Sequence, residues 1–112
     1  MQIKKNIFVI YSIRDEYVNK ESLIKINNEL EVFGNVFIDL IHNRSINKQE
    51  YVLQKLYESS YIVIINSPKI KESKWAQLEI KIAKDQNKQI LGYYEPIFID
   101  KNYELEFKQL IS

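Results

Sequence analysis

Apolar residues gather in four short runs along the chain, separated by longer segments of mixed polarity. The runs span residues 7–11, 36–40, 61–65 and 89–94 and are rich in β-branched and aromatic residues. They lack the strict alternation of a half-exposed strand, which favours strands covered on both faces, as in a parallel sheet. We therefore predict four buried strands.

The segments between the runs show helical periodicity and end signals. In the first segment, apolar residues recur at intervals of three and four: Leu23, Ile26, Leu30 and Phe33. Gly34 is a candidate C-terminal stop for this helix. Asn47, with Glu50 three residues later, resembles a capping box, and Ser73 is a natural N-cap for a third helix.

This alternation of strands and helices predicts an α/β fold. We expect a flavodoxin-like, doubly wound parallel sheet of four to five strands, with the order 2-1-3-4 for the first four. For the end of the chain, we expect a short edge strand at 97–99 and a last helix from about Asn102.

Length and composition limit the function classes. The 112 residues form one domain, 1–112, and the 16 basic and 15 acidic side chains nearly cancel, so no overall field attracts nucleic acid or an anionic membrane. With no cysteine and one histidine, thiol catalysis and disulfides are excluded, and we expect no metal site. The N-terminus lacks a cleavable-signal pattern, and no apolar run approaches the length of about 18 residues needed to span a membrane, so we expect a cytoplasmic protein.

Ligands of open α/β sheets bind beyond the carboxyl ends of the strands, where the connections diverge to opposite faces. The predicted topology brings polar or aromatic side chains from several segments to this edge: Tyr11, Ser12, Arg14, Asp15, Asp39, Asn66, Ser67, Ser73, Trp75 and Glu79. Arg14 is suited to a phosphate, although Arg14 and Asp15 also fit a strand-end turn and a helix cap. The chain has only two glycines and thus no glycine-rich phosphate loop.

Glu79 interrupts the amphipathic pattern of segment 73–88. At about 100° per residue it lies about 40° from Trp75, inside the apolar arc. The arc contains Trp75, Ala76, Leu78, Ile82 and Ala83. The carboxylate either reaches solvent or a lysine, or is buried with a raised pKa, which would make it a candidate catalytic group. Trp75 is either a core residue or a ring that stacks on a ligand.

Five segments, in order along the chain, resemble motifs of Toll/interleukin-1 receptor (TIR) domains. "IFVIYSIRDE" resembles their first strand and loop, "VFIDL" their second strand, and "LYESSYIVIINSP" their third-strand region. "SKWAQLEIKIA" resembles their Ser-x-Trp-x-x-x-Glu helix, and "NKQI" precedes the fourth strand as a related motif does in the family. The resemblance runs from about Ile7 to Tyr93 and implies a TIR-like three-layer sandwich.

The resemblance also implies a site. In TIR domains that cleave NAD, the glutamate four residues after the tryptophan is catalytic, which implies this role for Glu79. The implied substrate-binding residues are Tyr11, Ser12, Arg14, Asp39, Ser45, Ser73 and Trp75. NAD is then the substrate, and no cofactor is needed. Association with itself or with other TIR domains is implied too, because TIR enzymes complete their site between protomers. The loop after the second strand, "LIHNRSIN", lacks the glycine common there.

A single carboxylate suits the implied reaction. Nicotinamide leaves NAD as a neutral base from a cationic ring, so it needs no protonation, and one anion can stabilise the oxocarbenium-like ribose. The expected activity is a NAD glycohydrolase or cyclase, by family analogy in bacterial antiphage defence. Two alternatives stay open. One is a non-catalytic TIR interaction domain, and the other is a nucleoside deoxyribosyltransferase-like enzyme, whose usual Asp-x-Gly-Thr stretch is missing here.

Overall fold

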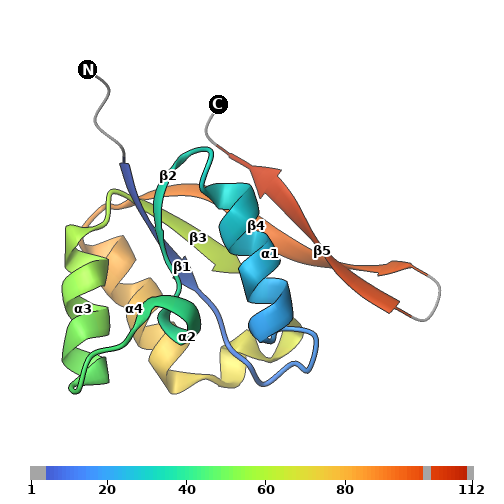
Figure 1. Ribbon diagram of the computed structural model, residues 1–112, viewed down its shortest axis with the longest axis horizontal. Helices are drawn as coiled ribbons and strands as arrows, with labels where there is room; N and C mark the ends of the chain where they lie inside the picture. The colour runs from blue at the N-terminus through green and yellow to red at the C-terminus, as the bar shows by residue number, and fades with distance from the viewer. Residues whose placement is uncertain (1–4, 100–101, 111–112) are drawn as a thin grey trace.

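The computed structural model describes residues 5–99 and 102–110 and contains one sheet with helices on both faces (Figure 1). The elements in chain order are β1 (Lys5–Ile10), α1 (Lys20–Leu30), β2 (Gly34–Phe37), α2 (Asp39–His42), α3 (Lys48–Glu58), β3 (Tyr61–Ile65), the 3-10 helix η1 (Pro68–Glu72), α4 (Lys74–Asp85), β4 (Gln89–Ile99) and β5 (Asn102–Gln109).

The sheet has the order β2-β1-β3-β4-β5, which confirms the predicted order of the first four strands and the α/β class. β1 lies between β2 and β3, with Ile7 opposite Val36 on one side and Tyr61 on the other. The first four strands run parallel, so the carboxyl ends of β1, β2 and β3 meet at one edge of the sheet. This edge is the one at which the sequence predicted the site.

The predicted helix from Asn102 is wrong, because residues 102–109 form β5, antiparallel to β4. The sequence contains the signal for a strand: Tyr103, Leu105 and Phe107 alternate with polar residues, which is the period of a half-buried strand. The proposed edge strand at 97–99 is the end of β4, which continues without interruption from Gln89. The sheet is therefore mixed rather than purely parallel.

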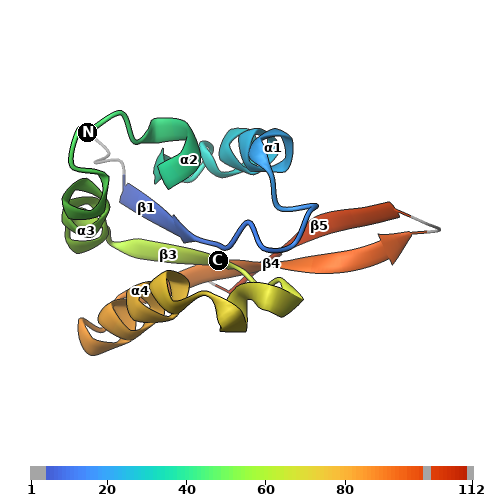
Figure 2. The same cartoon turned by 90° about the horizontal axis from the view of Figure 1, so that it is seen from below.

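Two hydrophobic cores cover the two faces of the central strands. Alternate β1 residues point to opposite faces, so Val9 packs with α1 residues such as Leu23, whereas Phe8 packs with Leu56 of α3 and Ala83 of α4. Figure 2 shows α1 and α2 on one side of the sheet and α4 on the other. The three layers expected of a TIR-like sandwich are thus present.

The predicted helix caps are present. The Asn47 side chain accepts a hydrogen bond from the Glu50 backbone N–H at 3.2 Å, and the Ser73 hydroxyl accepts one from Ala76 N–H at 3.1 Å. Gly34 does not end α1, which stops at Leu30; it begins β2, where a Cβ would collide with the Lys5 carbonyl oxygen of β1. Its role is close strand packing, not a left-handed turn.

The end of the β4–β5 hairpin projects beyond the helices (Figures 1 and 2). Pairing between β3 and β4 ends at Tyr94, whereas pairing between β4 and β5 continues to Ile99. We call residues 95–99 and 102–106 the arm. Tyr103 of the arm stacks on Tyr17 with ring centroids 4.5 Å apart, which attaches the arm to the loop before α1.

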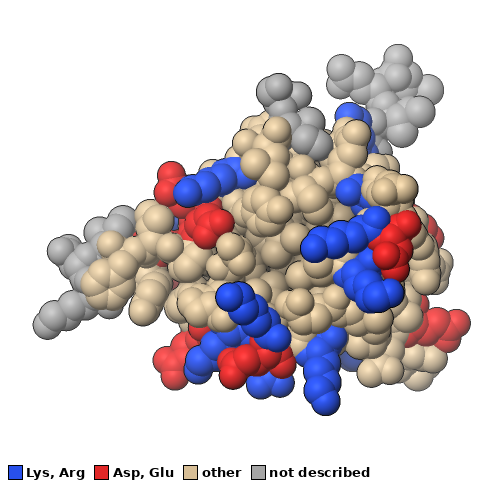
Figure 3. All heavy atoms as spheres, turned by 180° about the vertical axis from the view of Figure 1, so that it is seen from behind, with Lys and Arg blue, Asp and Glu red and all other residues tan. Residues whose placement is uncertain are grey.

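Charged side chains of both signs are interspersed on the face opposite that of Figure 1 (Figure 3). Within residues 5–99 and 102–110, the ion pairs are Lys55–Glu58 and Lys81–Asp85, each one helical turn apart. Exposed pairs of this kind contribute at most about 1 kcal/mol, so the two cores dominate stability. Within the same residues, the helices do not have the length and apolar character that a membrane span requires.

Candidate active site

A cleft of about 420 Å³ lies at the carboxyl edge of the sheet. Its walls come from the end of β1 and the following loop, from the start of α2, and from the first turns of α4. The lining residues are Val9, Tyr11, Ser12, Ile13, Arg14, Asp39, Leu40, Ser73, Trp75 and Glu79.

Of the eight site residues that the TIR resemblance implied, seven line this cleft and Ser45 does not. The predicted topology also brought Asp15, Asn66 and Ser67 to this edge, and they do not line the cleft. The Ser45 backbone N–H donates to the Asn43 side chain at 3.1 Å, and its hydroxyl donates to the Asn47 carbonyl at 3.3 Å. These bonds fold Ser45 into the turn before α3, away from the cleft. The structure therefore gives no support to a substrate contact by Ser45.

Three apolar cleft residues were not identified from the sequence: Val9, Ile13 and Leu40. Ile13 is 62% exposed and Leu40 is 47% exposed, although both line the cleft. Their positions carry a signal, because each lies within one or two residues of a polar side chain that was identified. Two exposed apolar side chains at a cleft can contact the flat face of a ligand ring.

Glu79 is buried in the cleft wall, with 5% of its surface exposed. It shares the buried face of α4 with Ala76 and Ala83, whereas Leu78, which the helical wheel placed in the same arc, is 41% exposed. Burial and, to a smaller extent, the negative charge of Asp39 raise the pKa of Glu79 to about 8. A hydrogen bond from Trp75 acts in the opposite direction. The free protein thus holds Glu79 mainly as the neutral acid at pH 7.

Trp75 is half-buried, and stacking of its ring on a ligand stays a prediction. It packs against the core between the sheet and α4, and it also lines the cleft. One turn of helix separates it from Glu79, which allows its indole to donate a hydrogen bond to the carboxyl group. Trp75 therefore both supports the helix and orients Glu79.

Tyr11 connects two walls of the cleft. Its hydroxyl oxygen accepts a hydrogen bond from the Leu40 backbone N–H at 2.8 Å, which joins the end of β1 to the first turn of α2. Burial is the largest cause of a raised Tyr11 pKa, and the charges of Asp39 and Glu79 add to it. The phenol stays protonated at neutral pH, so its O–H can donate to a carboxylate or to a ligand.

Asp39 is the second carboxyl group of the cleft. It is the first residue of α2 and is partly exposed, and the Asn43 side-chain amide donates a hydrogen bond to it at 2.7 Å. Asn43 is itself buried and also donates to the Lys48 carbonyl. The carboxylate of Asp39 is therefore held in place from the side of α3.

The loop after β1 is fixed by Asp15, which is 8% exposed. Its carboxylate accepts a hydrogen bond from the Lys69 backbone N–H at 2.9 Å, across 54 positions of sequence. Asp15 is thus not the cap of α1, a role taken by Asn19. The bond joins the loop carrying Ser12 and Arg14 to η1, which leads into α4.

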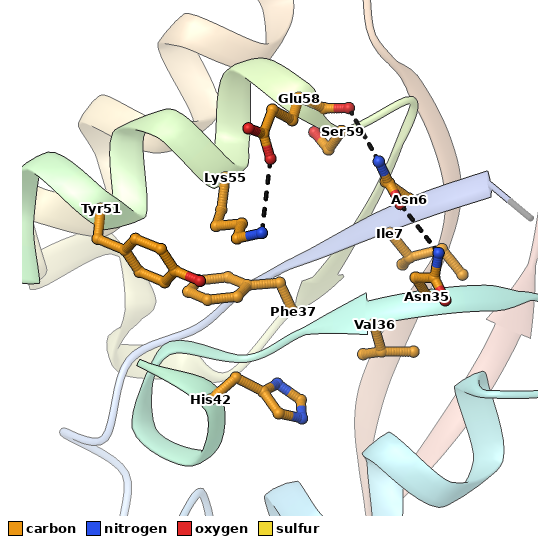
Figure 4. A pocket seen from close by; sticks show the side chains of 10 residues that line it. All are labelled: Asn6, Ile7, Asn35, Val36, Phe37, His42, Tyr51, Lys55, Glu58 and Ser59. Atoms are coloured by element: carbon orange, nitrogen blue, oxygen red, sulfur yellow. Dashed lines mark hydrogen bonds and ion pairs between the residues drawn. The ribbon is translucent and has the colours of Figure 1, made fainter. Parts of the chain in front are cut away.

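A second hollow, of about 260 Å³, lies between β2 and α3 (Figure 4). Its polar groups mostly bond to one another: Lys55 pairs with Glu58 at 3.5 Å, the Asn6 amide donates to the Glu58 carbonyl at 3.4 Å, and the Asn35 amide donates to Asn6 at 3.3 Å. The cleft at the carboxyl edge differs because Glu79 is buried there beside a second carboxyl group. That contrast makes the cleft the candidate active site.

The described residues offer no group of three or more histidine, aspartate or glutamate side chains that could hold a metal ion.

A comparison with protein families matches residues 8–97 to the TIR-like domain of Thoeris protein ThsB. The chain belongs to this ThsB TIR-like family. The resemblance drawn from the five sequence motifs is confirmed, and the match covers every segment that lines the cleft. No curated protein matches the chain.

Proposed function

We propose that this ThsB TIR-like chain cleaves NAD at the bond between nicotinamide and ribose, with Glu79 as the catalytic carboxyl group. The observation that supports the proposal most is the burial of Glu79 in a cleft at the carboxyl edge of the sheet, beside Trp75. A buried carboxyl group with a perturbed pKa in a cleft is typical of catalytic sites.

The charge of the substrate matches the chemistry of Glu79. A cationic nicotinamide ring near the carboxyl group favours its ionised form and so lowers its pKa. Substrate binding then converts Glu79 into the anion that stabilises positive charge developing on the ribose as the bond to nicotinamide breaks. Water, or a nucleophile of the substrate itself, completes the reaction at the ribose carbon.

The other lining residues supply contacts to the rest of NAD. Arg14 is exposed at the cleft and offers a guanidinium to the pyrophosphate. The Tyr11 hydroxyl and the Ser12 and Ser73 side chains offer hydrogen bonds to ribose, and Ile13 and Leu40 offer apolar contact to a base. This set does the work that a glycine-rich loop does in other nucleotide sites.

The test is incubation of the purified protein with NAD, followed by chromatographic measurement of nicotinamide release. We expect release by the wild type and by Glu104→Gln, a control on the exposed arm, but not by Glu79→Gln. The separated products distinguish linear from cyclised ADP-ribose. Absence of release at every protein concentration would favour a TIR domain that acts only by association.

We further propose that cleavage depends on association of the chain with itself. The cleft is open at the sheet edge, and in water the field of a carboxylate is weak because the dielectric constant is high. A second copy that covers the cleft would exclude water and strengthen this field. Specific activity should therefore rise with protein concentration across a hundredfold dilution series, followed by light scattering. Constant specific activity from a monomer would contradict this.

The matched family is the TIR-like domain of Thoeris protein ThsB, which supports a role for this chain in a Thoeris system. We propose that the product acts as a signal in bacterial antiphage defence. Phage plating on cells that carry the wild-type gene in its natural neighbourhood, compared with Glu79→Gln at equal protein level, tests this. Equal protection by the wild type and Glu79→Gln would mean that defence does not depend on the carboxyl group of Glu79.

A further inference from the structure

Asp39 and Glu79 form a pair of carboxyl groups in one cleft, although the cleavage of NAD requires only one. They come from different elements, α2 and α4, and they differ in environment. Glu79 is buried with an indole beside it, whereas Asp39 is partly exposed and accepts a hydrogen bond from Asn43 at 2.7 Å. A pair of carboxyl groups held in unlike environments is the arrangement of acid-assisted glycoside cleavage.

The charge of the leaving group decides whether an acid is needed. Nicotinamide departs from NAD without a proton, because its ring is already cationic. The purine of a nucleoside or nucleotide is neutral, and it leaves as an anion unless an acid protonates one of its nitrogens. A buried carboxylic acid that can donate a proton, with a second carboxyl group in the same cleft, provides what this second class of substrate requires.

We propose that the same cleft also hydrolyses the N-glycosidic bond of purine nucleosides or nucleoside monophosphates, with Glu79 as the general acid and Asp39 as the anion that faces the ribosyl cation. This inference rests on the cleft of the proposed function, but it uses the opposite protonation state of Glu79. A neutral substrate, unlike NAD, brings no positive charge that would ionise the buried group.

The reaction balances with water as the only co-reactant. The bond between C1′ of the sugar and the base nitrogen breaks, its electron pair goes to the base, and the proton of Glu79 goes to a purine nitrogen. Asp39 stabilises the positive charge on the sugar. Water then adds to C1′ and returns a proton to Glu79, so the products are free purine and the sugar or sugar phosphate.

The groups that act on Glu79 come from several elements. Burial raises the pKa of Glu79 most, Asp39 of α2 raises it further, and the Trp75 indole lowers it. Tyr11 and Arg14 line the same cleft from the end of β1 and the following loop. Ionisation of Glu79 around pH 8 therefore changes both activities, but in opposite directions. Turnover of NAD at low substrate concentration should rise with pH through this range, and turnover of a neutral nucleoside should fall.

The experiment measures free base from inosine and from adenosine monophosphate, beside nicotinamide from NAD, with one protein preparation between pH 6 and 9. We expect purine release that declines above about pH 8 and falls at least about 100-fold in Asp39→Asn and in Glu79→Gln, with Glu104→Gln as the control. Thermal melts establish whether each variant is folded. If Asp39→Asn does not fold, the pH profile of the wild type still tests the proposal.

The outcomes separate the two proposals. Nicotinamide release without purine release would overturn only the acid-assisted activity, and purine release without nicotinamide release would overturn only the cleavage of NAD. Purine release that increases with pH, or that persists in folded Asp39→Asn, would show that the carboxyl pair does not act as proposed.

Discussion

Two buried carboxyl groups lie at the same edge of the sheet, and their environments differ. Asp15 is 8% exposed and accepts a hydrogen bond from the Lys69 backbone N–H at 2.9 Å. Glu79 is 5% exposed, and the nearby charge of Asp39 adds to the effect of burial in raising its pKa to about 8. Asp15 joins the loop after β1 to η1, whereas Glu79 lies in a cleft wall and is disfavoured in its charged form.

The difference separates a structural carboxylate from a candidate catalytic one. A carboxylate that accepts a backbone hydrogen bond offsets part of its desolvation and stabilises the fold. A carboxyl group kept neutral by its surroundings gains from any ligand that supplies positive charge. Burial alone does not distinguish Asp15 from Glu79, whereas the groups that surround each residue do. Substitutions at both positions test this distinction.

The largest expected effect is on activity in Glu79→Gln. The substitution removes the ionisable group with almost no change in volume, so we expect nicotinamide release to fall by about three orders of magnitude while the fold persists. The melting temperature should stay the same or rise. The matched substitution, Asp15→Asn, should retain most of the activity. Near wild-type turnover by Glu79→Gln would remove Glu79 from the mechanism.

The second effect is on the pH dependence of stability. The folded-state pKa of Glu79 is raised from 4.5 to about 8, so its protonated form stabilises the fold fully below pH 4.5, and this contribution is lost as pH rises towards 8. At about 1.4 kcal/mol per pKa unit, the loss is a few kcal/mol. Chemical denaturation at several pH values should show the wild type losing stability relative to Glu79→Gln.

Comparing the wild type with Glu79→Gln removes the contributions of the other titrating groups from this measurement. His42 has a lowered pKa, mainly because of burial, so its protonation destabilises the fold as pH falls. That contribution has the opposite sign and is common to both proteins, so it cancels in their difference. A difference that does not change between pH 5 and pH 8 would mean that Glu79 is ionised in the folded protein throughout.

The sequence predicted the position of the cleft because parallel strands bring their carboxyl ends to one edge of the sheet. β3 was predicted with its observed bounds, and the Ser73 cap fixed the start of α4. The helical wheel placed Glu79 correctly on the buried face of α4, but it placed Leu78 there too. The sheet contacts α4 over a narrower arc than the apolar residues alone suggest.

The parts that the sequence did not predict depend on contacts between distant residues. The bond from Lys69 to Asp15 spans 54 positions, and no local pattern signals it. Ser45 lies outside the cleft because Asn43 holds the intervening turn. The strand β5 is different, because the alternation of Tyr103, Leu105 and Phe107 is visible in the sequence, and the expected helix is wrong.

The third expected effect is a decrease of about 2 kcal/mol in the free energy of unfolding of Trp75→Ala. A fully buried tryptophan costs about 3–5 kcal/mol when truncated, and Trp75 is only half-buried. Trp75→Phe is the matched variant, because it keeps an aromatic ring and removes the N–H that donates to Glu79. We expect Trp75→Phe to change the melting temperature little and to shift the pH profile of NAD cleavage to more alkaline values. An unchanged pH profile would mean that Trp75 contributes only to packing.

The smallest effect distinguishes Asp15→Ala from Asp15→Asn. Alanine leaves the Lys69 N–H without its acceptor, which costs about 1–3 kcal/mol, whereas asparagine retains an oxygen that can accept the bond and should cost less. Because the bond joins the loop of Arg14 to η1, Asp15→Ala should also raise KM for NAD more than it lowers kcat. Glu16→Ala, the exposed neighbour, is the control for both measurements. If asparagine destabilised the protein as much as alanine, Asp15 would contribute its negative charge rather than the hydrogen bond. The contrast with Glu79 would then lie in how each charge is compensated.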